Sequence, residues 1–214
     1  RVHLTLGNWA DAETLAARVI NEYNFQLVTP YADLWDIEND ASNEIVWAVQ
    51  YTGDPLTNDQ GNWGHLFFIF DYTFNPAMTR NLNYGRPWQR FLPTNYLLNL
   101  YDRSMDARWD GSFRTAWLAD IPAEINGQTV NPGDTAIKIV MQEVPDEVQE
   151  AAPYWLFDYK DNWIGSVTDE WEVGTNQRRN YPSLLKYMDP LRSSVNAQDG
   201  RRDFPVIRLA EMYL

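Results

Sequence analysis

The sequence predicts helices at both ends of the chain and, between them, a long irregular region with a few short strands. The opening stretch "GNWADAETLAARVI" and the closing stretch "PVIRLAEMYL" both carry apolar residues at helical spacing. The residues between them include runs rich in Gly, Asn, Asp and Pro, which are typical of loops, and no internal repeat. We therefore expect one domain with a loop-rich region over residues 31–200.

The first helix is expected to begin after Asn8, whose side chain can cap it, with Asp11 at the spacing of a capping box. The spacing of Gly, Trp and Ala in this stretch is typical of the second helix of a tetratricopeptide-like hairpin, where small Ala residues let the partner helix approach closely. Residues 1–30 are therefore predicted to end such a hairpin. The apolar stripe consists of Trp9, Ala12, Leu15, Ala16 and Val19.

The last stretch, residues 201–214, is predicted to start a further hairpin. After Pro205 the apolar residues recur at helical spacing, and no Gly, Asn or Pro follows to end the helix. Both ends are thus interpreted as halves of hairpins, and the chain as a single domain truncated at both ends.

Between the ends, a few local signals predict regular structure. Residues 44–51 alternate as a strand, and Asn126 with Gly127 suits a tight hairpin turn before another alternating run. Thr94 can cap a short helix that extends to Tyr101. The acidic stretch over residues 36–43 is predicted to be a solvated loop.

Composition excludes several classes of partner. The chain has 30 acidic and 17 basic residues, a net charge of −13, and no basic stripe that could neutralise phosphates. Nucleic acid and anionic membrane surfaces are therefore not expected partners. Cysteine is absent, which removes disulfides, thiolate metal sites and a Cys nucleophile. The longest apolar run, over residues 65–70, is too short to span a membrane.

Patterns for metals and cofactors are missing, so neither is expected. The two His residues, His3 and His65, lie far apart in the sequence and outside any zinc motif. The acidic residues from Asp36 to Glu44 alternate as in a calcium loop, but Ala41 and Trp47 stand where such a loop needs Gly and Glu. The glycines form no phosphate-binding loop, and no serine stands in a nucleophile elbow.

Paired carboxylates leave glycoside hydrolysis open as an alternative function. Glu143 with Glu147, or Asp158 with Asp161, have spacings that could form a catalytic pair. Nothing in the sequence brings either pair into a pocket, so we expect no catalysis.

The candidate ligand-binding residues are flat side chains set among amides and a guanidinium in polar loops. A sugar ring packs its C–H face on an aromatic plane, and its hydroxyls need amide, guanidinium or carboxylate partners. The alternative is that Tyr84 and Trp88 fill the underside of a loop. The predicted set is Trp63, Asn81, Asn83, Tyr84, Arg86 and Trp88.

The order of several blocks resembles the SusD/RagB family of outer-membrane nutrient-binding lipoproteins of Bacteroidetes. The blocks span nearly the whole chain in the family's order, and the closing block, with Arg208, Ala210, Glu211 and Leu214, is the most specific. They are "GNWADAETLAARVI", "YNFQLVTPYADLWD", "NEIVWAVQY", "PTNYLLNLYDRSMDARWDGSF", "NYPSLLKYMDP" and "RDFPVIRLAEMYL".

The resemblance implies a mainly α-helical, SusD-like fold with irregular loops and a few short strands. Tetratricopeptide-like hairpins would form a scaffold beneath a loop-rich half that carries the ligand surface. It also implies a non-catalytic protein that binds oligosaccharide on the cell-surface side of the outer membrane and delivers it to a SusC-like TonB-dependent transporter. Membrane attachment would come only from a lipid anchor outside this fragment.

Two further alternatives stay open beside the hydrolase. In the RagB-like branch of the family the cargo is peptide rather than oligosaccharide. A helical scaffold that binds only protein would instead use its Trp-rich loops for structure.

Overall fold

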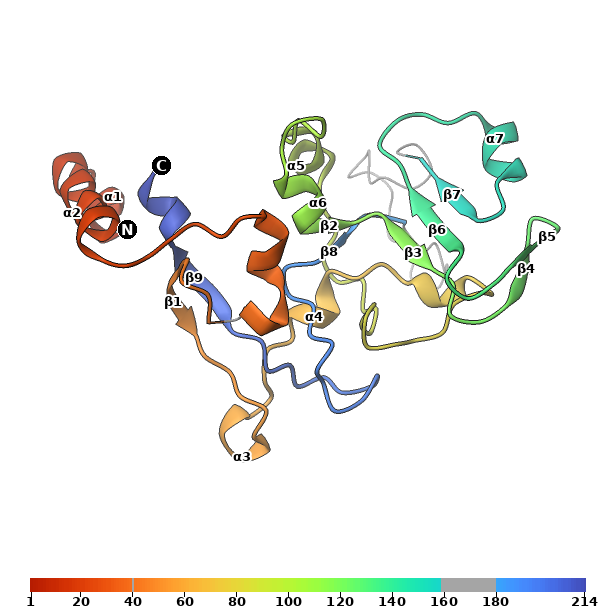
Figure 1. Ribbon diagram of the computed structural model, residues 1–214, viewed down its shortest axis with the longest axis horizontal. Helices are drawn as coiled ribbons and strands as arrows, with labels where there is room; N and C mark the ends of the chain where they lie inside the picture. The colour runs from red at the N-terminus through yellow and green to blue at the C-terminus, as the bar shows by residue number, and fades with distance from the viewer. Residues whose placement is uncertain (40, 159–179) are drawn as a thin grey trace.

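The computed structural model describes residues 1–39, 41–158 and 180–214 and shows an elongated chain. The helices of both chain ends lie together at one end of the molecule, where α2 packs against η4 (Figure 1). The opposite end holds small strands and one short helix. The terminal elements are α1 (Val2–Thr5), α2 (Trp9–Glu22) and η4 (Leu209–Met212).

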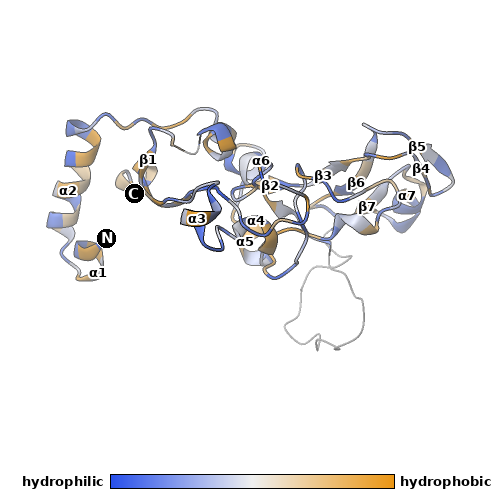
Figure 2. Cartoon of the chain, turned by 90° about the horizontal axis from the view of Figure 1, so that it is seen from below, coloured by the Kyte–Doolittle hydropathy of each residue, from blue (hydrophilic) through white to orange (hydrophobic). Residues whose placement is uncertain are grey.

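The predicted mainly α-helical fold with tetratricopeptide-like hairpins is wrong for the described part of the chain. α2 has 14 residues, and every other α-helix in the described ranges has 6 or fewer. A hairpin needs two helices of similar length packed against each other, whereas α1 has only 4 residues. Figure 2 shows α2 as a long helix at one end of the chain, with the short α1 beside it.

The predicted C-terminal helix is also wrong. Residues Phe204–Arg208 form strand β9, which pairs antiparallel with β1 (Ile45–Val49), and the chain continues into η4. Short apolar runs fit both helical and strand periods, and here the β-branched Val206 and Ile207 favour the strand. Pro205 has no N–H group to donate to the ladder. A two-stranded sheet with register shifts tolerates it, because both of its strands are edge strands.

The remaining strands form small sheets, in which β3, β6 and β7 make the largest described one. β6 pairs antiparallel with β3 and parallel with β7. The bounds are β2 (Phe113–Arg114), β3 (Ala116–Leu118), β4 (Ala123–Ile125), β5 (Gln128–Val130), β6 (Thr135–Ile139), β7 (Trp155–Phe157) and β8 (Ser183–Leu184), where β2 pairs with β8 and β4 with β5.

Three local predictions are confirmed. The strand expected over residues 44–51 is β1. Asn126 and Gly127 turn between β4 and β5 with positive φ angles of 49° and 74°. The Thr94 side chain accepts a hydrogen bond from the backbone N–H of Leu97 and caps α5, which ends at Asn99.

The predicted capping box of the first helix does not form. α2 begins at Trp9 as expected, but the Asn8 side chain makes no capping hydrogen bond. The Asp11 carboxylate instead lies 3.5 Å from Nδ1 of His3 in α1. α2 is therefore held by its contacts with α1 and η4 rather than by its own cap.

The described residues of the acidic stretch over 36–43 are mostly exposed, as predicted, with the short 3-10 helix η2 (Ile37–Asn39) among them. The 3-10 helix η1 (Tyr31–Trp35) precedes the stretch. Glu44, the last residue of the acidic run, is the exception to the solvated loop. The Glu44 side chain is buried, where its carboxylate pairs with Arg208 at 2.9 Å and accepts the backbone N–H of Val28 at 2.8 Å. Removing either partner would leave a buried charge uncompensated.

Loops as well as strands supply the apolar side chains of the main core, which includes residues of β3, β4, β5 and β6. Trp117 of β3 is fully buried and meets Phe70 edge to face, with ring centroids 4.8 Å apart. A smaller cluster joins Leu98, Trp109 and Phe113. The short helices around the core are α3 (Pro55–Asn58), α4 (Gly64–Phe67), η3 (Tyr72–Phe74), α5 (Asn95–Asn99), α6 (Arg108–Ser112) and α7 (Asp146–Ala151). None of the helices in the described ranges is both long and apolar enough to cross a bilayer.

Arg202 joins two parts of the chain that are distant in the sequence. Its buried guanidinium donates hydrogen bonds to the backbone carbonyls of Met188 at 2.7 Å, Trp35 at 2.7 Å and Asp36 at 3.0 Å. A charged donor strengthens such bonds, and burial makes them costly to lose.

His65 is buried close in sequence to Asn62, whose side chain donates a hydrogen bond to the carbonyl of Arg202. Its Nε2 lies 2.9 Å from the carbonyl oxygen of Gln198, and burial with the nearby Arg192 charge lowers its pKa to about 4. The imidazole is therefore neutral at pH 7 and donates that hydrogen bond.

We expect the substitution Arg202→Met to lower the free energy of unfolding by about 3 kcal/mol or more, because three backbone carbonyls lose a buried, charged donor. Chemical denaturation measures the change. The control is Arg201→Met at the neighbouring exposed arginine, for which we expect a change within about 0.5 kcal/mol. Equal losses in the two variants would show that the shared guanidinium contributes little.

We expect the free energy of unfolding to fall as the pH is lowered from 6.5 towards 4, in part through His65. In this window the unfolded chain binds the proton and the buried imidazole, with its pKa of about 4, does not. The 2.5-unit difference corresponds to about 3 kcal/mol lost by pH 4. Denaturation across this range should give a shallower pH dependence for His65→Gln than for the unchanged protein, and parallel curves would contradict the assignment.

Candidate functional site

A half-exposed cluster of aromatic side chains joins four segments of the chain. Its ring contacts run from Trp63 through Trp88 and Phe67 to Phe91, with neighbouring centroids 5.5 to 5.9 Å apart. The contacts continue from Phe91 through Phe68 and Tyr187 to Phe204, at 5.4 to 5.7 Å. We call these seven residues the aromatic cluster. Phe91 is 54% exposed and Phe204 41%, and the other five are half-buried.

Two guanidinium groups lie over the Trp88 ring. The Cζ atoms of Arg86 and Arg90 are 5.5 Å and 5.9 Å from its centroid. Such cation–π contacts orient charged donors beside an aromatic face. Arg86 also donates a hydrogen bond of 2.8 Å to the carbonyl of Asn196. This part of the cluster therefore combines an aromatic plane with hydrogen-bond donors.

Backbone hydrogen bonds fix the segment that carries Trp88 beside α4. The N–H of Trp88 donates to the carbonyl of Leu66 at 3.1 Å. The N–H groups of Arg90 and Phe91 both donate to the carbonyl of Phe67, at 2.9 and 3.0 Å. On the other side, the Trp63 indole N–H donates to the carbonyl of Gln60 at 2.7 Å. Hydrogen bonds within the protein thus fix the backbone of the segments that carry Trp63, Trp88 and Phe91.

The structure places the predicted Asn81 and Tyr84 in a supporting role. The Asn81 side chain accepts the Tyr84 N–H at 2.9 Å and donates to Asp120 at 3.1 Å, as in a side-chain-stabilised turn. The Tyr84 ring packs edge to face on Tyr72, and its hydroxyl accepts the Leu118 N–H at 3.0 Å. Tyr84 therefore matches the structural alternative raised for it, filling the underside of its loop.

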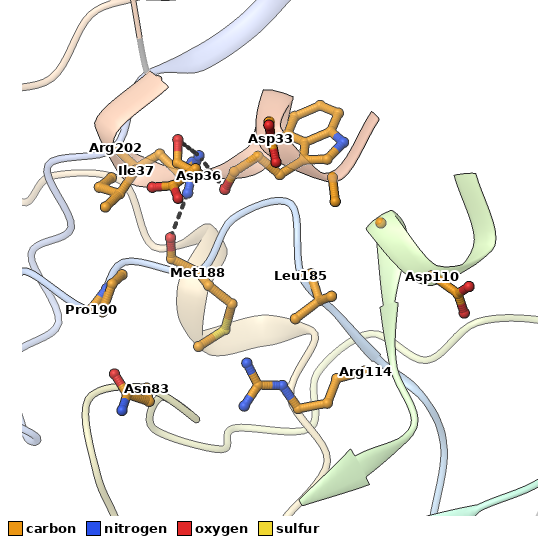
Figure 3. Close-up of a pocket in the computed structure, with 13 residues that line it drawn as sticks. Asp33, Asp36, Ile37, Asn83, Asp110, Arg114, Leu185, Met188, Pro190 and Arg202 are labelled. Atoms are coloured by element: carbon orange, nitrogen blue, oxygen red, sulfur yellow. Dashed lines mark hydrogen bonds between the residues drawn. The ribbon is translucent and has the colours of Figure 1, made fainter. Parts of the chain in front are cut away.

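Asn83 lines a separate pocket of about 450 Å³ (Figure 3). Asn83 and Arg114 lie on one side of this pocket, with Leu185 and Met188 beside them, and residues of η1 and η2 lie across from them. α6 approaches η1 closely because Gly111 has no side chain; a Cβ there would lie 2.7 Å from the Tyr31 ring. The hydrogen bonds of Arg202 hold the η1 side in place.

Arg114 points its guanidinium group into this pocket (Figure 3). It extends from β2, is half-buried, and its Cζ lies 4.5 Å from the Tyr84 ring centroid. Its guanidinium forms no hydrogen bond or ion pair with any residue in the described ranges. Burial lowers the pKa of Arg114 without discharging it, because a guanidinium stays protonated in proteins. The pocket therefore holds a partly desolvated cation whose donor positions are not used by any residue that the structure describes.

Three exposed carboxylates line the same pocket. They belong to Asp33 of η1, Asp36 and Asp110 of α6. In the part of the chain that the structure describes, the carboxylates of Asp33 and Asp110 accept no hydrogen bond, and Asp36 accepts only the N–H of Glu38. The pocket thus offers acceptors at its rim and donors at Arg114.

The sequence analysis missed Arg114 and the acidic rim. Arg114 comes shortly after Asp110 and Gly111, and nothing local in the sequence indicates that its side chain lacks a hydrogen-bond or ion-pair partner among the described residues. The rim residues come from segments that meet only through the fold. The predicted set therefore divides into Trp63, Arg86 and Trp88 at the aromatic cluster, Asn83 at the pocket, and Asn81 with Tyr84 in the loop support.

The candidate catalytic carboxylates are not gathered at either site. Glu143 and Glu147 are exposed and line neither the pocket nor the aromatic cluster. The Asp158 side chain is buried and accepts the N–H of Val144 at 2.7 Å. Its predicted partner Asp161 lies outside the described residues.

Comparisons with known proteins identify the family. The family model described as the SusD family matches residues 43–214. No curated protein and no solved structure matched the chain. The matched range contains the aromatic cluster and all the pocket residues except those of η1, Asp36 and η2. This chain belongs to the SusD family, whose members are generally non-catalytic cell-surface proteins that bind nutrients such as glycans.

Proposed function

We propose that this protein binds an oligosaccharide on the cell-surface side of the outer membrane and delivers it, without catalysis, to a SusC-like TonB-dependent transporter. The observation that carries the proposal is the group of Trp63, Arg86 and Trp88 at the half-exposed end of the aromatic cluster. Family membership supports the cell-surface location and the transporter as partner.

The chemistry of this group suits a sugar. The two indoles meet edge to face at 82°, so a pyranose ring stacked on one of them would have the other as a side wall. Arg86 and Arg90 flank the Trp88 plane and can donate hydrogen bonds to ring hydroxyls. A ligand on such an open surface keeps much of its hydration, so we expect each sugar unit to bind weakly. Longer oligosaccharides that contact several positions should bind with higher affinity.

A peptide ligand would need different hydrogen-bonding partners from a sugar. A peptide backbone presents amide N–H donors and carbonyl acceptors in regular alternation, commonly satisfied by a strand edge. The Trp63–Trp88 group offers side-chain donors around an aromatic face instead, which favours the sugar.

We expect Trp88→Ala to weaken the binding of the cognate oligosaccharide at least tenfold, because it removes the stacking plane and the partner of both guanidinium groups. Isothermal titration calorimetry with a panel of neutral oligosaccharides, and with a peptide mixture alongside, measures this. Trp63→Ala should act in the same direction.

The matched control is Trp47→Ala, which removes a 57% exposed tryptophan from β1 and should leave binding unchanged. Thermal unfolding of each variant separates loss of binding from loss of fold. Binding of peptides alone, or products appearing in the sugar mixtures, would overturn the proposal.

A further inference from the structure

The pocket beside the aromatic cluster has a charge pattern that the capture of a neutral sugar leaves unused. Arg114 supplies a half-buried guanidinium whose donor positions are unoccupied by any described residue. Its neighbours on that side, Leu185 and Met188, are apolar and reduce the hydration of the cation. A desolvated guanidinium binds best to a planar anion that accepts two parallel hydrogen bonds, and a carboxylate has that shape.

The opposite side of the pocket restricts which carboxylate fits. Asp33 and Asp36 offer only acceptor atoms there, and Asp110 adds another carboxylate from α6. Asn83 beside Arg114 offers both donors and an acceptor. A ligand that satisfies this rim must therefore carry several O–H donors in addition to its carboxylate. A uronic acid combines one carboxylate with a ring of hydroxyls. The cavity, at about 450 Å³, lies in the size range of small-molecule sites.

We propose that this pocket is a subsite for a uronic acid unit, with the carboxylate on Arg114 and the ring hydroxyls on Asn83 and the acidic rim. The inference rests on the proposed function, because it assigns an acidic sugar to the captured oligosaccharide. It adds a recognition residue, Arg114, that lies outside the aromatic cluster.

The three rim carboxylates and the net charge of −13 oppose an anionic ligand at long range. These rim groups are exposed, so water and salt screen them over a Debye length of about 8 Å at physiological ionic strength. The contact with Arg114 is made where the guanidinium is already half-buried, and there screening is weaker. Contact therefore outweighs repulsion, and added salt should change the affinity only modestly.

The test is calorimetric titration of the full chain with D-galacturonic and D-glucuronic acid, their uncharged methyl esters, and neutral galactose and glucose. We expect the free acids to bind at least tenfold more tightly than the esters and the neutral sugars. Arg114→Met keeps a side chain of similar length against Tyr84 and should remove this preference. Arg114→Lys keeps the charge without the two-pronged geometry and should restore part of it.

The matched control is Arg18→Met, which removes an exposed arginine from α2 and should leave the preference intact. Thermal unfolding of the Arg114 variants checks their fold. Equal affinities for acids and esters would overturn the inference, as would binding of free amino acids or short peptides through Arg114 in place of the uronic acids.

Failure of this inference can be told from failure of the proposed function. A neutral oligosaccharide that binds and depends on Trp88, while no uronic acid depends on Arg114, would remove the subsite and leave capture at the aromatic cluster in place. If no sugar binds to the unchanged protein or to either set of variants, both the uronic acid subsite and the proposed function would be overturned.

Discussion

The arrangement of the pocket depends on one buried guanidinium. Arg202 binds carbonyl groups from residues 35 and 36 and from Met188, so it fixes segments that are more than 150 positions apart in the sequence. Around these contacts the chain forms only turns and the short 3-10 helices η1 and η2. The guanidinium donates hydrogen bonds to the backbone carbonyls of these segments and so fixes their relative positions, which sheet or helix packing does in more regular folds. The pocket walls follow from that junction and from the close approach of α6 at Gly111.

Local signals predicted local structure well, and failed where distant contacts decided. The Asn126–Gly127 turn, the Thr94 cap and strand β1 need only a few neighbouring residues, and each was read correctly. The C-terminal stretch fits a helix by spacing alone, but pairing with β1 makes it a strand. Glu44 belongs to an acidic run that reads as solvated, yet Arg208 neutralises it from the other end of the chain. No pattern within eight or ten residues could show either partner.

The site shows the same division. Trp63 and Trp88 were predicted from aromatic side chains in polar loops, and the fold brings them into contact. Tyr84 stands in a similar loop but turns inward, because its hydroxyl completes the edge of β3 and its ring meets Tyr72. Arg114 could not be recognised at all, since what distinguishes it is the lack of a described partner, and that is a property of the fold. Composition identifies candidate ligand chemistry, while only packing decides which side chains remain available for it.

The way Trp88 is mounted has a consequence for how such a protein can change over evolutionary time. Its segment is held to α4 by main-chain hydrogen bonds to Leu66 and Phe67, which any residue except proline could make at the donor positions. The identity of the ring is thus uncoupled from the stability of its support. Substitutions of surface side chains can therefore change the preferred ligand without rearranging the backbone. Related proteins with the same backbone can then bind different nutrients.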